Sequence, residues 1–339
     1  MTAASDWTGS VGDIWAAEWR RTDRSFADLS RHLDAAILAA APDGPFRALD
    51  IGCGAGCTSL ALAEARPDAT ILGVDLSEGL VEVARNRLAI APPVLPRRRE
   101  PRAASDNLRN SGLPLARERG LVWRGESSDD REAAAGEVGT NHRILRPSPE
   151  YAVAEGGVRF ETGDAITAVN ASAPFDLLYS RHGVMFFDDP VAAFTALRDA
   201  TAPGARLVFS CFADWSENAF AKAIADALDL SPPTPRASGP FAFADERYVA
   251  DILTKSGWTQ QRATQTPFTY RAGEEEGEAA IADARSFFQR IGPAAGPLRA
   301  ASSVDRPAML DRLTAIIQEH RVGNAIDFPA LAWIWSATA

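Results

Sequence analysis

The fold of this chain is decided by one stretch, Ala48-Leu49-Asp50-Ile51-Gly52-Cys53-Gly54-Ala55-Gly56. The apolar run at 46–51 predicts a buried strand, and the alternating glycines after it predict a tight turn where the backbone can approach a ligand closely. A helix-like segment at 58–66 follows, so its unpaired first N–H groups face the same turn. A strand-to-helix turn without a ligand has the same pattern. What the turn holds must therefore be decided from the segments around it.

Strand-like and helix-like segments alternate on both sides of this turn. The strand-like runs fall at 70–76, 158–164, 175–180, 205–210, 259–270 and 327–339. The helical patterns fall at 77–90, 190–200, 276–290 and 307–320. Asp189 is placed to cap the helix that starts at Pro190. This alternation predicts an α/β fold, with a parallel sheet that carries helices on its faces.

The segment 91–157 interrupts the alternation. It holds seven of the chain's 22 prolines and shows no sustained hydrophobic period. Its arginine triplet at 97–99 suggests nucleic acid, but the eleven arginines between 91 and 150 lie among nine acidic residues, a local net charge of only +2. Because links in α/β units usually take two to six residues, we expect a solvated, disordered insertion. It would join the sheet at the amino ends of the strands, away from a ligand at the carboxyl ends.

The rest of the chain divides into a helical cap at 1–45 and a core formed by 46–90 and 158–339, with a helical lid at about 275–322.

The 339 residues carry 35 basic and 45 acidic side chains, and a net charge of −10 argues against a nucleic-acid partner. The sequence has no apolar run of eighteen residues, so we expect no membrane span.

The cysteines and histidines also limit the class of protein. Cys53, Cys57 and Cys211 form no C-x-x-C pair, and the acidic, tryptophan-containing first twenty residues do not resemble a secretory signal. We therefore expect a cytoplasmic protein without disulfides. The four histidines show no metal-ligand spacing, so no metal is expected.

Asp75 ends the second strand-like run, 25 positions after Asp50. A carboxylate there can accept hydrogen bonds from both hydroxyls of a ribose, and it would repel a 2′-phosphate. This fits NAD and equally any other adenosine cofactor. The dinucleotide pattern G-x-G-x-x-G, however, requires glycine where the chain has Cys57, and no G-K-[ST] follows that would complete a P-loop.

Five segments in order resemble the motifs of the class I, Rossmann-like S-adenosylmethionine-dependent methyltransferases. They are 48–56 (motif I), 73–77 (acidic loop), 160–165 (adenine segment), 175–190 (fourth strand and following helix) and 202–207 (turn into the fifth strand). The Trp7…Gly12…Trp15 pattern and the Phe-rich run 183–187 are similar to the small-molecule group related to quinone-ring methyltransferases. The resemblance implies a doubly wound, seven-stranded, mostly parallel sheet with helices on both faces and an antiparallel last strand.

The resemblance also implies how the first loop would hold S-adenosylmethionine. Asp50 would face the amino-acid part of the cofactor, beside the backbone of Gly52, Cys53, Gly54 and Gly56. A purely structural alternative is open for Asp50, which could simply orient the loop.

Four later residues would meet the adenosine part. Asp75 would bind the ribose diol, and Leu76 would pack on the adenine. Asp164 would accept the adenine amino group, with the N–H of Ala165 nearby. Asp164 could equally be the N-cap of a short helix that begins at Ala165.

The end of the fourth strand would place Ser180 and Arg181 next to the methionine moiety and the acceptor. Methyl transfer from a sulfonium is an in-line displacement that depends on alignment and exclusion of water, and an acidic acceptor needs no base. His182 is the candidate base for a less acidic acceptor, although a packing role is also open. Trp15 and Trp19 are candidates for core or lid packing, or for a contact with the sulfonium.

The acceptor implied by the aromatic and apolar lid segments is a small, apolar or aromatic molecule. Two other functions stay open: an NAD-dependent oxidoreductase, or a non-catalytic scaffold that resembles a methyltransferase. The sequence specifies neither the acceptor atom (C, N, O or S) nor the oligomeric state.

Overall fold

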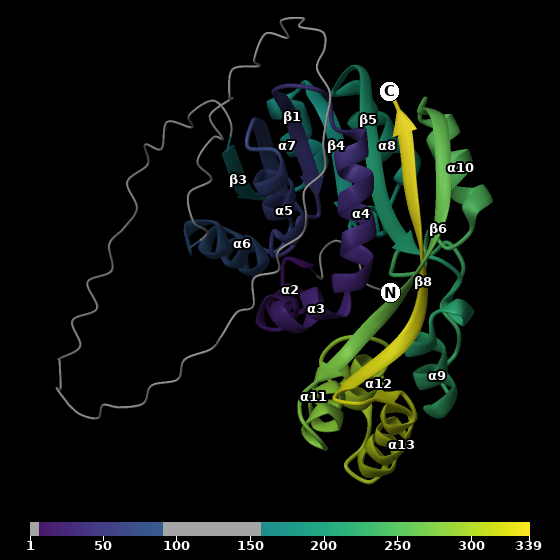
Figure 1. Cartoon of the computed structure of the whole chain (residues 1–339). Helices are drawn as coiled ribbons and strands as arrows, with labels where there is room; N and C mark the ends of the chain where they lie inside the picture. The colour runs from purple at the N-terminus through teal and green to yellow at the C-terminus, as the bar shows by residue number, and fades with distance from the viewer. Residues whose placement is uncertain (1–6, 91–156) are drawn as a thin grey trace, which may run out of the picture. The chain divides into compact units, whose positions relative to one another are not determined.

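The structure is a computed structural model that describes residues 7–90 and 157–339 (Figure 1). The predicted insertion at 91–157 lies outside these residues except for Gly157, which begins a strand. All described residues belong to one structural unit. Within them, no helix is long and apolar enough to cross a membrane.

A single mixed sheet forms the centre of this unit. Its strands are β1 (Phe46–Ile51), β2 (Ala69–Asp75), β3 (Gly157–Thr162), β4 (Phe175–Arg181), β5 (Thr201–Phe212), β6 (Thr259–Glu274), β7 (Arg321–Val322) and β8 (Ala325–Thr338). The order is β3-β2-β1-β4-β5-β8-β6, and β7 pairs only with β8. β1 to β5 run parallel, whereas β8 is antiparallel to both neighbours. The predicted α/β class, mostly parallel sheet and antiparallel last strand are confirmed, and the two-residue β7 is an addition.

Helices lie on both sides of this sheet. They are α2 (Ser10–Ala17), α3 (Trp19–Ser25), α4 (Ala27–Ala40), α5 (Cys57–Ala65), α6 (Glu78–Ile90), α7 (Ala165–Ser172), α8 (Pro190–Asp199), α9 (Ala219–Ala227), α10 (Glu246–Lys255), α11 (Ala279–Phe288), α12 (Ala295–Ala300) and α13 (Asp305–Glu319). In Figure 1, α4 and α5 cross the front of the sheet while α8 lies behind it. The Asp189 carboxylate accepts a hydrogen bond from the N–H of Ala192 at 3.0 Å, which confirms the predicted cap of α8.

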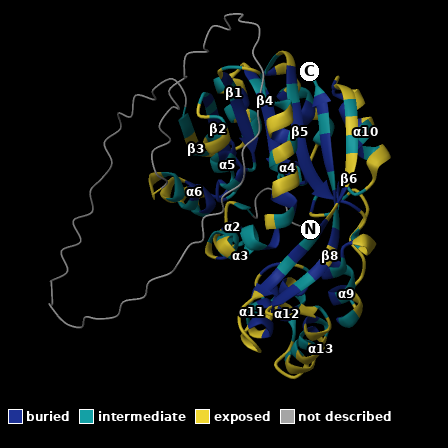
Figure 2. Cartoon of the chain, in the orientation of Figure 1, coloured by how far each residue is buried: buried dark blue, intermediate teal, exposed yellow. Residues whose placement is uncertain are grey.

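The core lies between the sheet and its helices, as the dark blue strands of Figure 2 show. Leu49, Ile71, Leu178 and Leu207, one from each of four parallel strands, are completely buried. Strands covered on both faces need apolar side chains on both, which explains why these segments read as continuous apolar runs rather than alternating ones.

β6 and β8 form a long antiparallel pair that carries α11 to α13 (Figure 1). At the other end of the described chain, α2 packs against α6 and α3 packs against β6. The N-terminal helices are thereby held beside the carboxyl ends of the parallel strands, where ligands bind in open α/β sheets.

Candidate functional site

A cavity of about 190 Å³ lies between the turn after β1 and helices α2 and α3. Its lining comes from segments far apart in the sequence: Trp7, Trp15, Trp19, Thr22, Asp23, Phe26, Asp50, Gly52, Cys53, Gly54, Ala55, Thr58, Asp75, Leu76, Leu80, Arg181, His182, Gly183, Met185, Phe186, Phe212 and Pro240. The wall is mainly apolar and aromatic, with a few charged groups. Such a mixture is typical of small-molecule sites.

The glycine turn presents its backbone to this cavity. Gly52, Gly54 and Gly56 have φ angles of 67°, 52° and 78°, which side-chain-bearing residues rarely adopt. A Cβ on Gly54 would meet nothing within 4 Å, so open space lies in front of the turn. A Cβ on Gly56 would lie 2.7 Å from the Phe160 ring. Gly54 therefore leaves room for a ligand, whereas Gly56 leaves room for packing.

Asp75 fixes the shape of the same turn. Its Oδ2 atom accepts a hydrogen bond from the N–H of Gly54 at 2.8 Å, and its Oδ1 atom accepts one from the N–H of Ser77 at 2.9 Å. Burial raises the pKa of Asp75, and the two backbone donors oppose that rise. Asp75 thus joins β2 to the glycine turn while its carboxylate lines the cavity.

Asp50 ends a chain of buried hydroxyl groups. It is 1% exposed, and the Ser59 hydroxyl donates to its Oδ2 atom at 2.7 Å. The Tyr179 hydroxyl lies 3.1 Å from Ser59 Oγ and acts as the donor, because the single hydroxyl proton of Ser59 is already used. Burial raises the pKa of Asp50 to about 7, despite the Ser59 hydrogen bond and nearby Arg181. Asp50 therefore changes protonation state near neutral pH.

Asp23 of α3 closes the other side of the cavity. Its two carboxylate oxygens bind Arg181 Nη2 and Arg87 Nη1, each at 2.8 Å. Arg87 also donates to the carbonyl of Ala55 at 2.8 Å. We call Asp23, Arg87 and Arg181 the Asp23 latch, because these residues tie α3 to both α6 and the end of β4.

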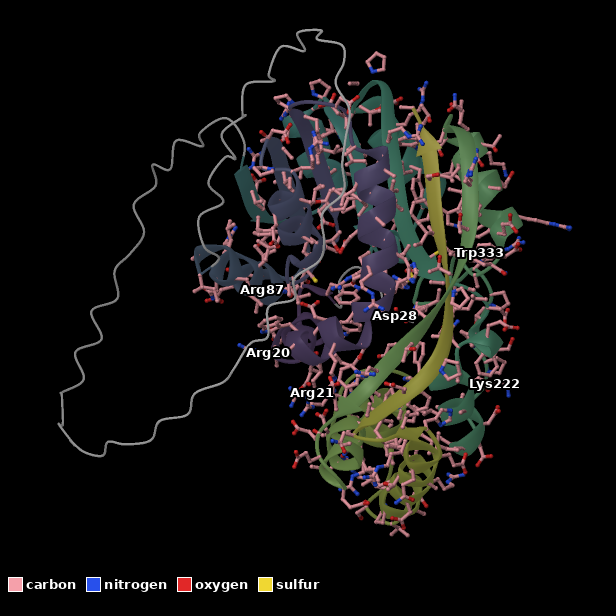
Figure 3. All side chains as sticks on the ribbon, viewed as in Figure 1. Arg20, Arg21, Asp28, Arg87, Lys222 and Trp333 are labelled. Carbon is pink, nitrogen blue, oxygen red and sulfur yellow. The ribbon has the colours of Figure 1, made fainter. Side chains whose placement is uncertain are left out.

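Trp19 packs against the arginine of the Asp23 latch that comes from α6. Figure 3 labels Arg20 and Arg87, and both guanidinium groups lie over the ring of Trp19, at 4.5 and 4.3 Å from its centroid. Cation–π contacts of this kind stabilise an aromatic side chain at a protein surface. Sequence reasoning considered Trp19 for core or lid packing or for a contact with the sulfonium, but it missed Asp23, which no motif or spacing distinguishes.

His182 follows β4 in a left-handed conformation, with φ of 61°. Its Nδ1 atom lies 2.8 Å from Ser210 Oγ, and its Nε2 atom is buried with no hydrogen-bond partner among the described residues. The ring packs against Phe212 and Phe26, with centroid separations of 4.3 and 5.1 Å. Burial, and secondarily the charge of Arg181, lowers the pKa of His182 to about 3. The imidazole is therefore neutral at physiological pH.

Most of the predicted site residues meet at this cavity. Those in its lining are Asp50, Gly52, Cys53, Gly54, Asp75, Leu76, Arg181 and His182. Gly56, Asp164, Ala165 and Ser180 are not in it. Ser180 is buried, donates to the carbonyl of Ile51 at 2.6 Å and accepts from the N–H of Gly183 at 3.0 Å. Asp164 caps α7 by accepting from the N–H of Thr167 at 2.8 Å.

Of the two segments considered for a lid, the N-terminal one lines the cavity. Within the described chain, α11, α12 and α13 give no residue to the cavity lining, and the covering wall comes from α2, α3 and the residue before α4. Sequence reasoning had considered the predicted cap at 1–45 for this role together with the segment 275–322. It had not singled out five of the lining residues, Thr22, Asp23, Phe26, Phe212 and Pro240.

Comparison with known proteins gives a family match. A family model described as a methyltransferase domain matches residues 20–261. A demethylmenaquinone methyltransferase of Symbiobacterium thermophilum is 49% identical over 45 residues, which are 13% of this chain and 18% of that protein. A trans-aconitate 2-methyltransferase of Methylobacterium nodulans is 42% identical over 64 residues, which are 19% of this chain and 25% of that protein. The aligned segments thus span a quarter or less of these relatives.

Solved structures are similar at lower identity. The YcgJ protein of Bacillus subtilis is 15% identical, with 90% of this chain and 97% of that chain covered and a TM-score of 0.45. Phosphoethanolamine N-methyltransferase 2 of Haemonchus contortus, solved with S-adenosylhomocysteine, is 14% identical, with 97% and 57% covered and a TM-score of 0.44.

Proposed function

This chain belongs to the methyltransferase domain family, and we propose that it transfers the methyl group of S-adenosylmethionine to a small, apolar or aromatic acceptor. The family match confirms the family that the five motifs indicated. The observation that carries the proposal is the convergence of Asp50, Asp75 and the open backbone at Gly54 on one cavity with aromatic walls.

The residues present fit a cationic adenosine cofactor. The space in front of Gly54 leaves room for a ligand against the backbone, and the carboxylates of Asp50 and Asp75 border the same space. Asp50 is suited to an ammonium group, because a nearby positive charge would favour its ionised form at neutral pH. Asp75 is suited to hydroxyl groups, since each of its oxygens can accept a second hydrogen bond beyond the backbone one.

The chemistry supplied by the cofactor is an electrophilic methyl group, whose bond to sulfur breaks as the bond to the acceptor forms while sulfur keeps the electron pair. The protein aligns the acceptor with the methyl group and excludes water from the cavity. The Asp23 latch ties α3, which carries Trp19, to α6 and to the end of β4 beside the cavity. Holding two reactants in an attack geometry can lower a barrier by roughly 7–11 kcal/mol.

The other predicted contacts divide into two groups. Leu76 and Arg181 line the cavity, so we propose them as cofactor or acceptor neighbours. We assign structural roles to Gly56 and Ser180 from their packing and hydrogen bonds, and a capping role to Asp164, beside Ala165.

We also propose a small molecule rather than a nucleic acid as acceptor, because a net charge of −10 repels a polyanion. A cytoplasmic location is supported by Cys53, Cys57 and Cys211, which are all free thiols in the structure.

A thermal-shift and calorimetric titration with S-adenosylmethionine, S-adenosylhomocysteine and NAD tests the cofactor. A ligand at about 100 times its Kd adds roughly 2.7 kcal/mol to the free energy of unfolding, so Tm should rise by several degrees with both adenosyl compounds. Stabilisation by NAD alone would overturn the proposal in favour of an oxidoreductase. Binding of S-adenosylmethionine without turnover of phenols, enolic ketones, thiols, amines or carboxylates would favour a scaffold.

A further inference from the structure

Three residues that line the cavity each carry a buried polar atom without a hydrogen-bond partner among the described residues. Trp7 Nε1, Thr22 Oγ1 and His182 Nε2 are buried and have no hydrogen-bond partner in the described part of the chain. All three residues line the cavity, although only six described side chains have such an atom. Buried polar groups in proteins are nearly always paired, so these three atoms are candidates for pairing with a bound ligand. An indole N–H can only donate, so that ligand offers acceptor atoms.

The hydrogen bond between His182 and Ser210 determines which proton the imidazole presents. The Ser210 hydroxyl has no side-chain partner other than His182 Nδ1 among the described residues. If Nδ1 carried the proton and donated it, both the hydroxyl proton and the Nε2 lone pair would be left unpaired. If the hydroxyl donates to Nδ1, only the N–H at Nε2 is left unpaired. The second arrangement leaves fewer buried groups unsatisfied, so Nε2 carries the proton.

The main chain fixes the position of this donor. The N–H of His182 donates to the carbonyl of Ser210 at 3.2 Å, so backbone and side chain are held by the same residue of β5. The backbone of the next residue, Gly183, packs closely against the first strand, because a Cβ there would lie 2.5 Å from the carbonyl oxygen of Ile51. A left-handed residue in a site wall is a form of local strain that often accompanies function.

We propose that His182 donates a hydrogen bond from Nε2 to an oxygen atom of the methyl acceptor, and that this acceptor is a phenolate, an enolate or a carboxylate. The inference deepens the proposed methyl transfer and rests on it. Trp7, which also lines the cavity, carries a second unpaired donor.

Among the described residues that line the cavity, we assign none as the base for an acceptor that arrives protonated. His182 is a poor base at neutral pH because its pKa is about 3. Asp23 is bound to two arginines, and Asp50 and Asp75 border the cofactor space. An acceptor that is already ionised, or readily ionised, needs no proton removed by the protein.

A matched pair of variants tests the donor. In His182→Gln, the side-chain amide can place an N–H near the position of Nε2 while its oxygen accepts from Ser210. In His182→Asn, the side chain also tolerates the left-handed backbone but is too short to reach the Nε2 position. Binding of phenol, benzoate, toluene and aniline is measured by NMR titration on each protein saturated with S-adenosylhomocysteine.

The wild-type protein and His182→Gln should bind phenol and benzoate at least tenfold more tightly than toluene and aniline, and His182→Asn should lose that preference. Equal binding of all four probes, binding of none, or an unchanged preference in His182→Asn would overturn the inference. Binding of S-adenosylhomocysteine by calorimetry is the first arm. If S-adenosylhomocysteine does not bind, the proposed function itself is contradicted. If it binds but phenol and benzoate are not preferred over toluene and aniline, only the role of His182 is contradicted.

Discussion

The two walls of the cavity differ in how their polar groups are satisfied. On the wall formed by the glycine turn, both oxygens of Asp75 accept backbone N–H groups and Asp50 accepts from Ser59. On the wall formed by α2, α3 and the ends of β4 and β5, Trp7, Thr22 and His182 each leave a polar atom unpaired. Within the described chain, these two carboxylates of the first wall are hydrogen-bonded, whereas the three polar atoms of the second wall are not.

This difference suggests separate roles for the two walls in binding the cofactor and in selecting the acceptor. A site whose side chains are held by the backbone is preorganised, so little ordering is needed when a ligand binds. A wall with unpaired donors discriminates more sharply, because a ligand that lacks the matching atoms leaves those donors buried and unsatisfied. We therefore expect the glycine-turn wall to determine cofactor affinity and the opposite wall to determine acceptor choice.

The largest expected effect comes from Asp75→Ala. The substitution removes the acceptor of the Gly54 and Ser77 N–H groups as well as the proposed ribose contact, so affinity for S-adenosylhomocysteine should fall about 100-fold. Isothermal titration calorimetry measures the change. Asp75→Asn, which keeps one acceptor oxygen, should lose less. Unchanged affinity in Asp75→Ala would show that the two walls do not divide the tasks in this way.

A smaller effect is expected where the two walls are joined. Asp23→Asn removes the charge that holds Arg87 and Arg181 together, so α3 should open more readily and S-adenosylhomocysteine should dissociate about tenfold faster. Stopped-flow displacement measures the rate. The matched control is Asp229→Asn, which breaks an exposed ion pair with Arg312 and should change nothing. Equal rates in the two variants would mean that the latch does not retain the ligand.

The protonation of Asp50 gives a pH test of the glycine-turn wall. With a pKa raised to about 7, Asp50 becomes neutral as the pH falls and can no longer pair with an ammonium group. The Kd for S-adenosylhomocysteine should rise roughly eightfold between pH 7.5 and pH 6, and it should be flat in Asp50→Asn. The stability that the neutral carboxyl contributes changes in the opposite sense to the affinity: it is present in full below about pH 4 and is lost as the pH rises through 7. A flat wild-type profile would contradict the assignment.

The two walls also differ in how far the sequence predicted them. Asp50, the glycines and Asp75 are consecutive features of a strand-turn-helix-strand unit, where short-range rules fix which backbone atoms face the ligand. Thr22, Asp23 and Phe212 come from α3 and the end of β5, and only the tertiary fold brings them together. Asp164 and Ser180 match their motifs in sequence, yet Asp164 caps its own helix and the Ser180 hydroxyl bonds to the carbonyl of Ile51 on the neighbouring strand. Local sequence patterns predicted the fold and the glycine-turn wall, whereas the opposite wall depends on packing between segments far apart in the sequence.

Trp7→Phe tests the second wall with the smallest chemical change. It removes the unpaired indole N–H and keeps an aromatic ring beside Trp15 and Phe186. Binding of benzoate to the protein saturated with S-adenosylhomocysteine should weaken about fivefold, the cost of one hydrogen bond. The affinity for S-adenosylhomocysteine itself should stay constant. A loss of cofactor affinity instead would place the indole N–H in the cofactor site.

The least effect is expected from a deletion that joins Ile90 to Gly157 through a short linker. Gly157 pairs with Thr70 at the start of β2, whereas Thr162 pairs with Asp75 at its end. The connection therefore enters the sheet five residues, or about 16 Å, from the level of the glycine turn. The Kd for S-adenosylhomocysteine and the rate of methyl transfer should change by less than twofold. A folded deletion variant, shown by circular dichroism, that no longer binds S-adenosylhomocysteine would mean that a third region contributes to the site.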